Sequence, residues 1–379
     1  MKRIVKQVIG IDVAQAELVV CVGRTDENGE PDMYAHKTFA NTKKGFGILV
    51  AWVRKQTDAT APVWYVMEAT GVYHESLAYF LDEQQVNVSI ILPNKIYSFA
   101  RSLDTKTVTD KTASEAITQF GLSRKLDAWH RPNALYKKLR QLSRERGQLV
   151  DERTALKNQM HAEQAEAEPC KESVTRTKKR IALLDKQEKE IMKQVKALIK
   201  TDAEVMRVVD LMCTLPGVGL ITAVSVISET NGFDLIRNKR QLTSYAGLDV
   251  KEKQSGTSVK GKPSISKRGN KFLRKAMHFP ALTAIRVDPR YGAIFTRLFK
   301  KHGIRMKAVV AVQRKLLELM YTMYKTNKEY ESEYLTKDKN VEKVEAEATR
   351  VTKNLRNNQL VDCPPKQAGK SRLHVHTKI

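Results

Sequence analysis

Two short apolar runs that each end in a carboxylate constrain the fold of this chain more than any other feature. The first is Val8-Ile9-Gly10-Ile11-Asp12, and the second is Val63-Trp64-Tyr65-Val66-Met67-Glu68. A run of this length predicts a buried strand, and an acid at its carboxyl end lies in the crevice where α/β sheets bind ligands. Carboxylates in such a place repel one another and resist desolvation, so a partner must offset their charge.

A hard divalent cation offsets that charge well, because Mg2+ prefers carboxylate oxygens and leaves room for substrate phosphates. The rest of the chain is suited to a polyanion, with 67 Lys and Arg against 42 Asp and Glu and a formal charge of +25. Such an excess attracts nucleic acid through counterion release. We therefore expect metal-dependent phosphodiester chemistry on nucleic acid. A membrane-surface or ribosome-associated role is the alternative that composition leaves open.

The cysteines and the apolar stretches narrow the cellular setting. The four cysteines have neither the spacing of zinc ligands nor that of a disulfide framework, which suits a reducing cytosol. No stretch is long and apolar enough to span a membrane, and no signal peptide is visible. We expect a cytoplasmic, nucleoid-associated protein with no membrane partner.

Residues 1–130 are predicted to form an α/β domain. The expected elements are strands at 8–13, 17–23, 33–39, 63–68 and 86–92, and helices at 46–53, 74–82 and 110–122. A meander of three strands followed by strand, helix, strand and helix is the order of a ribonuclease-H-like fold. The fold class expected for the whole chain is α/β plus α.

Three further segments are expected after this domain. Residues 131–202 are charge-rich with apolar residues at helical spacing, and Glu168-Pro169-Cys170 interrupts them, which predicts two helices of a coiled-coil arm. The arm serves either oligomerisation or spacing. Residues 203–325 predict a basic, mainly helical domain that ends in an apolar helix. Residues 326–379 are a charged tail with little to bury, which predicts disorder.

A ribonuclease-H-like site needs a further acid from a later helix. Asp110 fills this place, with Thr109 as the expected N-cap. Together with Asp12 and Glu68 it would hold two cations on either side of a scissile phosphate. Each acid alone has a plainer interpretation, Asp12 as an ordinary strand-end acid and Asp110 as a helix-start acid favoured by the macrodipole. The ordered set of three favours the catalytic interpretation.

The segment from Lys253 to Lys262 contains Ser255, Lys260 and Lys262 among glycines and hydroxyl residues, which predicts an exposed basic loop. Ser255 would be a nucleophile if a base removed its proton and the phosphate charge were neutralised. No His or Asp partner is near in the sequence. On chemistry alone, a flexible loop whose serines hydrogen-bond phosphates is the better interpretation.

Two other segments are candidates for phosphate contacts. Leu215-Pro216-Gly217-Val218-Gly219-Leu220 joins two apolar helical stretches, and Gly217 and Gly219 would leave backbone N–H groups free at a helix start. A plain helix connection is the alternative. The segment 266–275 is predicted to open a helix, with four cations that position a duplex rather than read bases. These cations are Lys267, Arg268, Lys271 and Arg274.

In these segments the chain resembles the DEDD transposases of the insertion sequence 110 family. Ile9-Gly10-Ile11-Asp12 and Met67-Glu68-Ala69-Thr70-Gly71-Val72-Tyr73 resemble the N-terminal half of that family. The C-terminal half is matched by Pro216-Gly217-Val218-Gly219, Tyr245-Ala246-Gly247-Leu248, Ser255-Gly256-Thr257-Ser258 and Ser266-Lys267-Arg268-Gly269-Asn270. The resemblance covers about residues 7 to 325 and keeps the order of the motifs.

The resemblance implies a RuvC-like domain, a coiled-coil arm and a transposase domain with a catalytic serine. By motif match, Ser255 would form a phosphoserine link to DNA, and Asp12, Glu68 and Asp110 would bind Mg2+ or Mn2+. The implied partners are donor and target DNA, a structured bridge RNA that guides recombination, and further copies of the chain in a dimer or tetramer. The resemblance therefore favours Ser255 as a nucleophile over a loop whose serines only hydrogen-bond phosphates.

The chain departs from the family pattern at one position. The family reads Thr-Asp-x-x-Asp-Ala, whereas Ala113 stands here in the place of the fourth acid. Either three acids suffice, or Glu115 or Asp104 substitutes, or this copy has reduced activity. Two other classes stay open: a junction-resolving nuclease that uses metal-activated water, and a non-catalytic RNA-binding scaffold.

Overall fold

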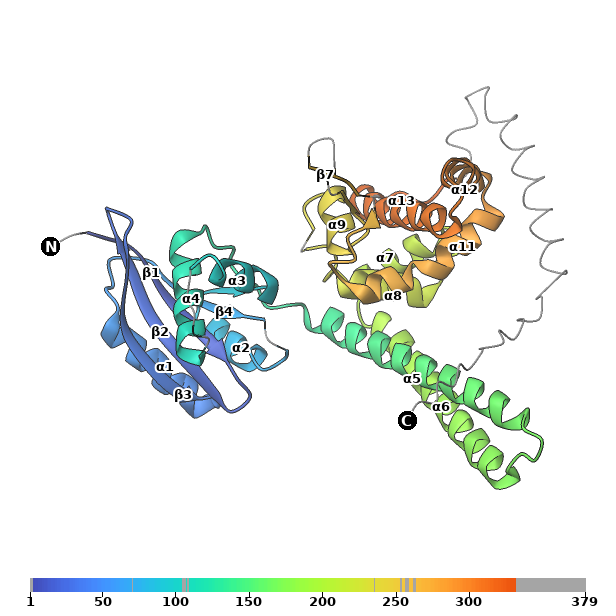
Figure 1. The fold of residues 1–379 in the computed structure, drawn as a ribbon, viewed down its shortest axis with the longest axis horizontal. Helices are drawn as coiled ribbons and strands as arrows, with labels where there is room; N and C mark the ends of the chain where they lie inside the picture. Colours follow the sequence, from blue (N-terminus) through green and yellow to red (C-terminus); the bar gives the residue numbers. More distant parts are fainter. Residues whose placement is uncertain are drawn as a thin grey trace, which may run out of the picture. The chain divides into compact units, whose positions relative to one another are not determined.

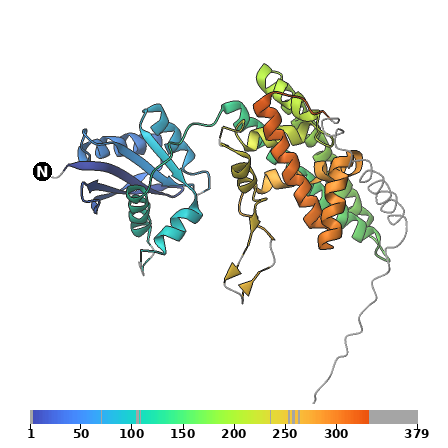
Figure 2. The same cartoon turned by 90° about the horizontal axis from the view of Figure 1, so that it is seen from above.

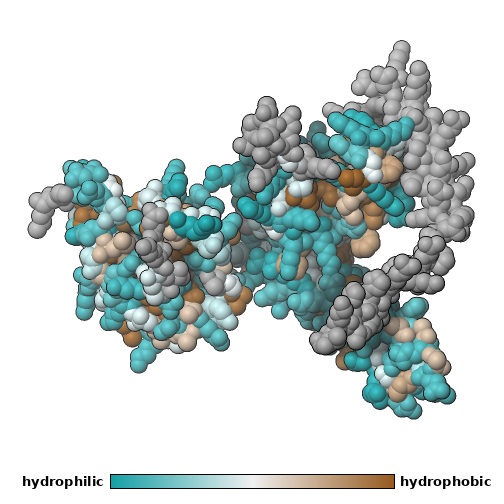
Figure 3. Space-filling model, in the orientation of Figure 1, coloured by the Kyte–Doolittle hydropathy of each residue, from teal (hydrophilic) through white to brown (hydrophobic). Residues whose placement is uncertain are grey.

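The computed structural model describes residues 3–331 with gaps at 70, 104–106, 108, 235, 253, 256–258 and 262–263, and only the backbone of 254, 255, 259 and 260. The chain forms two compact units, Met1–Arg131 and Pro132–Ile379, and each is described by itself (Figure 1). The face drawn in Figure 3 is mainly hydrophilic, with small hydrophobic patches. In the part of the chain that the structure describes, no helix is both long and apolar enough to cross a membrane.

The first unit is built on a five-stranded sheet with the order β3-β2-β1-β4-β5. The strands are β1 (Ile4–Val13), β2 (Glu17–Asp26), β3 (Pro31–Ala40), β4 (Val63–Glu68) and β5 (Asn87–Ile91). The first three form an antiparallel meander, and β4 lies parallel to both β1 and β5. This is the arrangement expected from the ribonuclease-H-like order, and it places the carboxyl ends of β1, β4 and β5 at one edge.

Helices cover both faces of this sheet. They are α1 (Lys43–Gln56), α2 (Glu75–Glu83), α3 (Pro93–Ala100) and α4 (Asp110–Ser123). One core packs α1 and α2 against Ile9, Ile11 and Met67, and the other packs α3 and α4 against Val8 and Val66. Because alternate residues of β1 and β4 enter different cores, both strands are apolar throughout. Helix α3, which begins at Pro93, was not predicted from the sequence.

Helix α4 packs directly on the backbone of β1 because glycine leaves room for it. A Cβ atom at Gly10 would lie 2.2 Å from Thr118 Oγ1 and 2.5 Å from the carbonyl oxygen of Ser114. Likewise, a Cβ atom at Gly121 would lie 2.7 Å from Val8 Cγ1. These close approaches fix the position of α4, and therefore of its first residue, relative to the end of β1.

The second unit is helical. Its helices are α5 (Ala134–Gln164), α6 (Lys171–Ile199), α7 (Ala203–Cys213), α8 (Leu220–Glu229), α9 (Lys239–Tyr245), α10 (Lys271–Ala276), α11 (His278–Val287), α12 (Pro289–His302) and α13 (Arg305–Thr326). Helices α5 and α6 lie side by side (Figure 1), and the break between them contains Pro169 as expected. Leu139 and Leu142 of α5 belong to the same core as α7 to α13. The base of the predicted arm is therefore continuous with the helical body.

The segment between α9 and α10 is a β-ribbon rather than a loop. Its strands are β6 (Val250–Lys251), β7 (Gln254–Ser255), β8 (Val259–Lys260) and β9 (Ser264–Ile265). β6 pairs with β9 and β7 pairs with β8, both antiparallel, so that one hairpin is nested within the other. We call these four paired strands the ribbon. It projects from the helices of this unit (Figure 2).

Candidate active site

Asp12, Glu68 and Asp110 lie at one edge of the first unit. Ile11 pairs with Met67 in the parallel ladder, so the next residues, Asp12 and Glu68, lie side by side. The axes of neighbouring strands are about 4.8 Å apart. Side-chain alternation directs both acids to the face that α3 and α4 cover. Asp110 is the first residue of α4. Asp12 and Glu68 are half-buried and Asp110 is exposed.

The three carboxylates are close enough to influence one another. Burial raises the pKa of Asp12, and the negative charges of Asp110 and Glu68 raise it further. The backbone N–H of Val13 acts in the opposite direction. The charges of Asp110 and Glu68 therefore act on Asp12, as expected for acids that lie at one edge of the sheet.

The donor set fits a hard divalent cation, because crowded carboxylate oxygens are the ligands that Mg2+ prefers. The acids nonetheless do not form a closed metal site as they stand. Within the described ranges, no group of three or more His, Cys, Asp and Glu side chains is arranged to hold a metal ion.

The start of α4 is firmly held. The side chain of Thr109 accepts a hydrogen bond from the backbone N–H of Thr112, and the Thr112 hydroxyl accepts one from the backbone N–H of Thr109. This reciprocal arrangement is a capping box, and it confirms Thr109 as the N-cap. The backbone at Asp110 is thus ordered before any ligand binds.

Neither Glu115 nor Ala113 adds a carboxylate to the cluster. The carboxylate of Glu115 lies 2.9 Å from His36 Nε2 on β3, which is at the other side of the sheet order from β4. Five helical residues turn Glu115 away from the face of Asp110, so the suggestion that it completes the set is corrected. Ala113 supplies no ligand, and Asp104 lies outside the described residues.

Ser255 belongs to the second unit, where it ends β7 opposite Val259. It therefore stands at the closed end of the nested hairpin, next to the undescribed residues 256–258. Lys260 follows on β8, and Lys262 lies outside the described residues. The sequence predicts a flexible loop here. Because its strands pair in two ladders, the ribbon restricts the backbone at Ser255 more than such a loop would.

The glycine-containing connection before α8 has the expected form. Gly217 has a φ of 84°, a conformation that favours glycine, and Gly219 is the N-cap of α8. Both are exposed, and no side chain caps this helix start. Its N–H groups are thus available to a phosphate.

The basic segment 266–275 differs from the prediction. Helix α10 begins only at Lys271, so Lys267 and Arg268 lie in the exposed loop before it. Lys271 is also exposed. Arg274 instead donates hydrogen bonds from Nη1 to the carbonyls of Ala246, at 2.8 Å, and Gly269, at 3.3 Å. Arg274 Nη1 therefore helps to hold this loop, and the assignment of Arg274 to duplex contacts stays a prediction.

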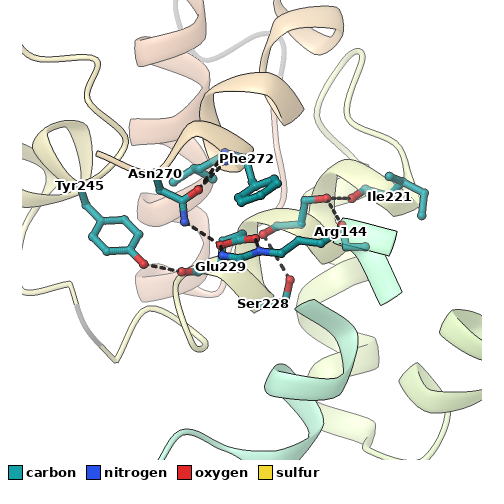
Figure 4. A network of polar contacts seen from close by, with 10 residues as sticks. Arg144, Ile221, Ser228, Glu229, Tyr245, Asn270 and Phe272 are labelled. Atoms are coloured by element: carbon teal, nitrogen blue, oxygen red, sulfur yellow. Dashed lines mark hydrogen bonds and ion pairs between the residues drawn. The ribbon is translucent and has the colours of Figure 1, made fainter. Parts of the chain in front are cut away.

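A buried polar network that was not predicted from the sequence surrounds Glu229, the last residue of α8 (Figure 4). The Glu229 side chain is only 2% exposed. Arg144 Nε and Nη2 donate to its two carboxylate oxygens at 2.7 and 2.8 Å, and Asn270 Nδ2 donates to Oε2 at 2.6 Å. The Tyr245 hydroxyl donates to its backbone carbonyl at 2.8 Å. The one available signal was a carboxylate that ends an apolar helix.

Comparison with known families supports the reading of both units. A family model for IS110-type DEDD transposases matches residues 9–164. A second model, for transposases of the IS116/IS110/IS902 family, matches residues 209–295. The chain belongs to this family of DNA transposases.

The chain is also similar to individual proteins. It is 26% identical over 331 residues to the pilin gene-inverting protein of Moraxella bovis, covering 86% of this chain and 98% of that protein. The pilin gene-inverting protein of Moraxella lacunata gives the same values. A structure of T. thermophilus RuvC with a Holliday junction substrate matches 30% of this chain and 90% of that chain, at 12% identity and a TM-score of 0.23. That likeness is too remote to carry weight beside the strand order.

Proposed function

We propose that this transposase cuts and rejoins DNA through a covalent phosphoserine intermediate at Ser255. The observation that carries the proposal is the crowding of Asp110 and Glu68 around the partly buried Asp12. This arrangement suits phosphodiester chemistry assisted by a cation. The family membership and the position of Ser255 at the end of the ribbon support a nucleophile supplied by the second unit.

Asp12, Glu68 and Asp110 would hold Mg2+ or Mn2+, which would neutralise the scissile phosphate and the oxygen that leaves it. The Ser255 oxygen attacks the phosphorus, an Oγ–P bond forms, and the P–O bond to one strand breaks. The serine proton passes overall to the departing strand oxygen. Rejoining is the reverse: a strand hydroxyl attacks the phosphoserine, and the proton returns to Ser255. Each step conserves one phosphodiester-type bond, so no external energy source is needed.

Exposed cations and amides of the second unit would hold the DNA backbone. Lys267, Arg268 and Lys271 are exposed, and the N–H groups at the start of α8 are available. These groups contact phosphates without reading bases, so they would supply affinity and register rather than sequence choice. Sequence choice would come from a structured guide RNA, as the family resemblance implies, and the working assembly would be a dimer or tetramer.

The pilin gene-inverting relatives suggest the kind of outcome. Their name describes the inversion of a gene, which requires strands to be cut and rejoined to new partners. We extend the same class of reaction to this chain. A nuclease that resolves junctions with metal-activated water would only cut.

The proposal is tested by strand exchange on labelled donor and target DNA, with the RNA that copurifies from the native host. Wild-type protein should give rejoined products, and Ser255→Ala should give none. A Ser255→Ala protein that still cuts with a divalent cation would favour the nuclease instead. Sequencing the bound RNA tests guidance separately, because random cellular RNA would contradict it.

A further inference from the structure

The Glu229 network joins three parts of the second unit that are far apart in the sequence. Arg144 comes from the long helix α5, Tyr245 from the end of α9, and Asn270 from the loop before α10. Figure 4 shows their polar groups directed toward Glu229. We call these four residues the Glu229 cluster. The guanidinium of Arg144 also lies over the ring of Phe272, 4.2 Å from its centroid.

Both ends of the ribbon are tied to this cluster. The chain enters the ribbon just after Tyr245 and leaves it just before Asn270. The backbone N–H of Asn270 donates to the Tyr245 carbonyl at 2.7 Å. A Cβ atom at Gly269 would lie 2.4 Å from that same carbonyl oxygen, so only glycine permits the contact.

The base of the ribbon carries further backbone contacts of this kind. The N–H of Ser266 donates to the carbonyl of Asp249 at 2.9 Å, and that of Lys267 donates to Gly247 at 3.1 Å. The Ser266 hydroxyl also donates to the Asp249 carboxylate. These bonds join the outer strands β6 and β9 to the segments that carry Tyr245 and Asn270, so the strands move together with the Glu229 cluster.

Asn270 is fixed from two directions. Its side-chain oxygen accepts hydrogen bonds from the N–H groups of Phe272 and Leu273, which caps α10, while its amide nitrogen donates to Glu229. Loss of the Glu229 charge therefore alters a carboxylate contact of a residue that also sets the start of α10. Lys267 and Arg268 lie on the same short loop.

The cluster is better suited to fixing geometry than to adding stability. Buried ion pairs contribute little net stability compared with apolar side chains, because desolvation offsets their attraction. The apolar residues of α8 already lie in the large core, among them Val224, Val226 and Ile227. A bidentate Arg–carboxylate pair instead restricts direction, since two parallel hydrogen bonds define one plane.

We propose that Glu229 is a positioning residue that joins the arm helix α5 to the base of the ribbon and so sets where Ser255 is presented. The inference rests on the proposed role of Ser255. Glu229 takes no part in the chemistry itself. A misplacement of a reacting group by about 1 Å can cost about 100-fold in rate, so a small tilt of the ribbon base is sufficient.

The test compares Glu229→Gln with Glu188→Gln. Glu188 forms ion pairs with Arg146 and Arg153 within the α5–α6 pair, so it is a matched control for the loss of an ion-paired carboxylate charge. We expect Glu229→Gln to slow formation of the Ser255–DNA adduct by about 10- to 100-fold. DNA affinity and the fraction of protein that finally reacts should match those of Glu188→Gln. If Glu229→Gln acted only by unfolding part of the protein, it would lower the fraction of protein that finally reacts.

Hydrogen exchange gives a readout that needs no DNA. Amides of 247–252 and 264–270 should exchange faster in Glu229→Gln than in wild-type protein, while those of α13 stay protected. If Glu229→Gln does not fold, Arg144→Lys and Arg144→Gln serve instead, and Lys should restore part of the adduct rate.

Equal adduct rates and equal ribbon exchange in Glu229→Gln and Glu188→Gln would overturn the inference. Failure of the wild-type protein to form any adduct would instead overturn the proposed function, and the inference with it. The two failures are thus distinguished by the wild-type control.

Discussion

At the scale of single residues, the most telling group is the Asp12 carboxyl. Its pKa is raised by burial and by two other carboxylates, so its charge opposes folding when no cation is bound. This is the expected signature of a site in which a functional cation replaces a structural counterion. Glu115, by contrast, has a partner of its own in His36, whose Nε2 lies 2.9 Å from its carboxylate.

Asp12→Asn should stabilise the protein in EDTA at neutral pH. A carboxyl whose pKa is raised on folding contributes stability below its unfolded pKa, and that contribution is lost as pH rises through the folded pKa. Asparagine removes the charge responsible for the loss. The gain should vanish toward acidic pH, where Asp12 is already neutral, and thermal unfolding followed across this range measures it.

The control for this measurement is Asp58→Asn, also in the first unit. Hydrogen bonds from Thr60 lower the pKa of Asp58, so the same substitution there should give no gain at neutral pH. In addition, Mn2+ should raise the melting temperature of wild-type protein and not that of Asp12→Asn. An Asp12→Asn protein that is less stable than wild type in EDTA would contradict the interpretation.

Ala113→Asp should increase the affinity for divalent cations and lower stability in EDTA. Ala113 lies one turn after Asp110 on α4, so a carboxylate there would add to the crowded set. We expect an affinity gain of about 10-fold or more, measured by titration calorimetry with Mn2+. Glu115→Gln should leave that affinity unchanged. If Glu115→Gln weakened Mn2+ binding and Ala113→Asp left it unchanged, Glu115 and not position 113 would lie next to the cation.

At the scale of elements, the contact between α4 and β1 determines where Asp110 lies. Gly10→Ala would place a Cβ atom 2.2 Å from Thr118 Oγ1, so α4 must shift away from the sheet. Overpacking of this kind costs about 1–3 kcal/mol of unfolding free energy. We expect this loss in chemical denaturation, together with weaker Mn2+ binding. Gly47→Ala, where a Cβ atom meets nothing within 4 Å, is the control.

The sequence predicted most elements of the first unit because their apolar residues follow clear periods. It missed α3 because a proline after an apolar strand indicates a turn as readily as the first turn of a helix, which is where Pro93 lies. The ribbon was missed because its glycines, lysines and hydroxyl residues show no apolar alternation, so its ladders depend on backbone pairing alone. The partners of Glu229 and Arg274 come from distant segments, which spacing in the sequence does not indicate.

At the scale of the whole molecule, the two halves of the proposed chemistry belong to different units. The acids lie in Met1–Arg131 and Ser255 lies in Pro132–Ile379. One family model covers the three acids and continues to residue 164 in the second unit, whereas the other covers Ser255, and both match in the expected order. We therefore expect loss of either half to abolish strand exchange, although each unit has a core of its own.

The most direct measurement is to map the covalent link between protein and DNA. Wild-type protein with its copurified RNA, Mg2+ and labelled DNA should yield a peptide carrying a nucleotide on Ser255, identified by mass spectrometry after nuclease digestion. Asp12→Asn and Ser255→Ala should yield none. A nucleotide on another residue, or strand rejoining by Ser255→Ala, would contradict the proposed mechanism.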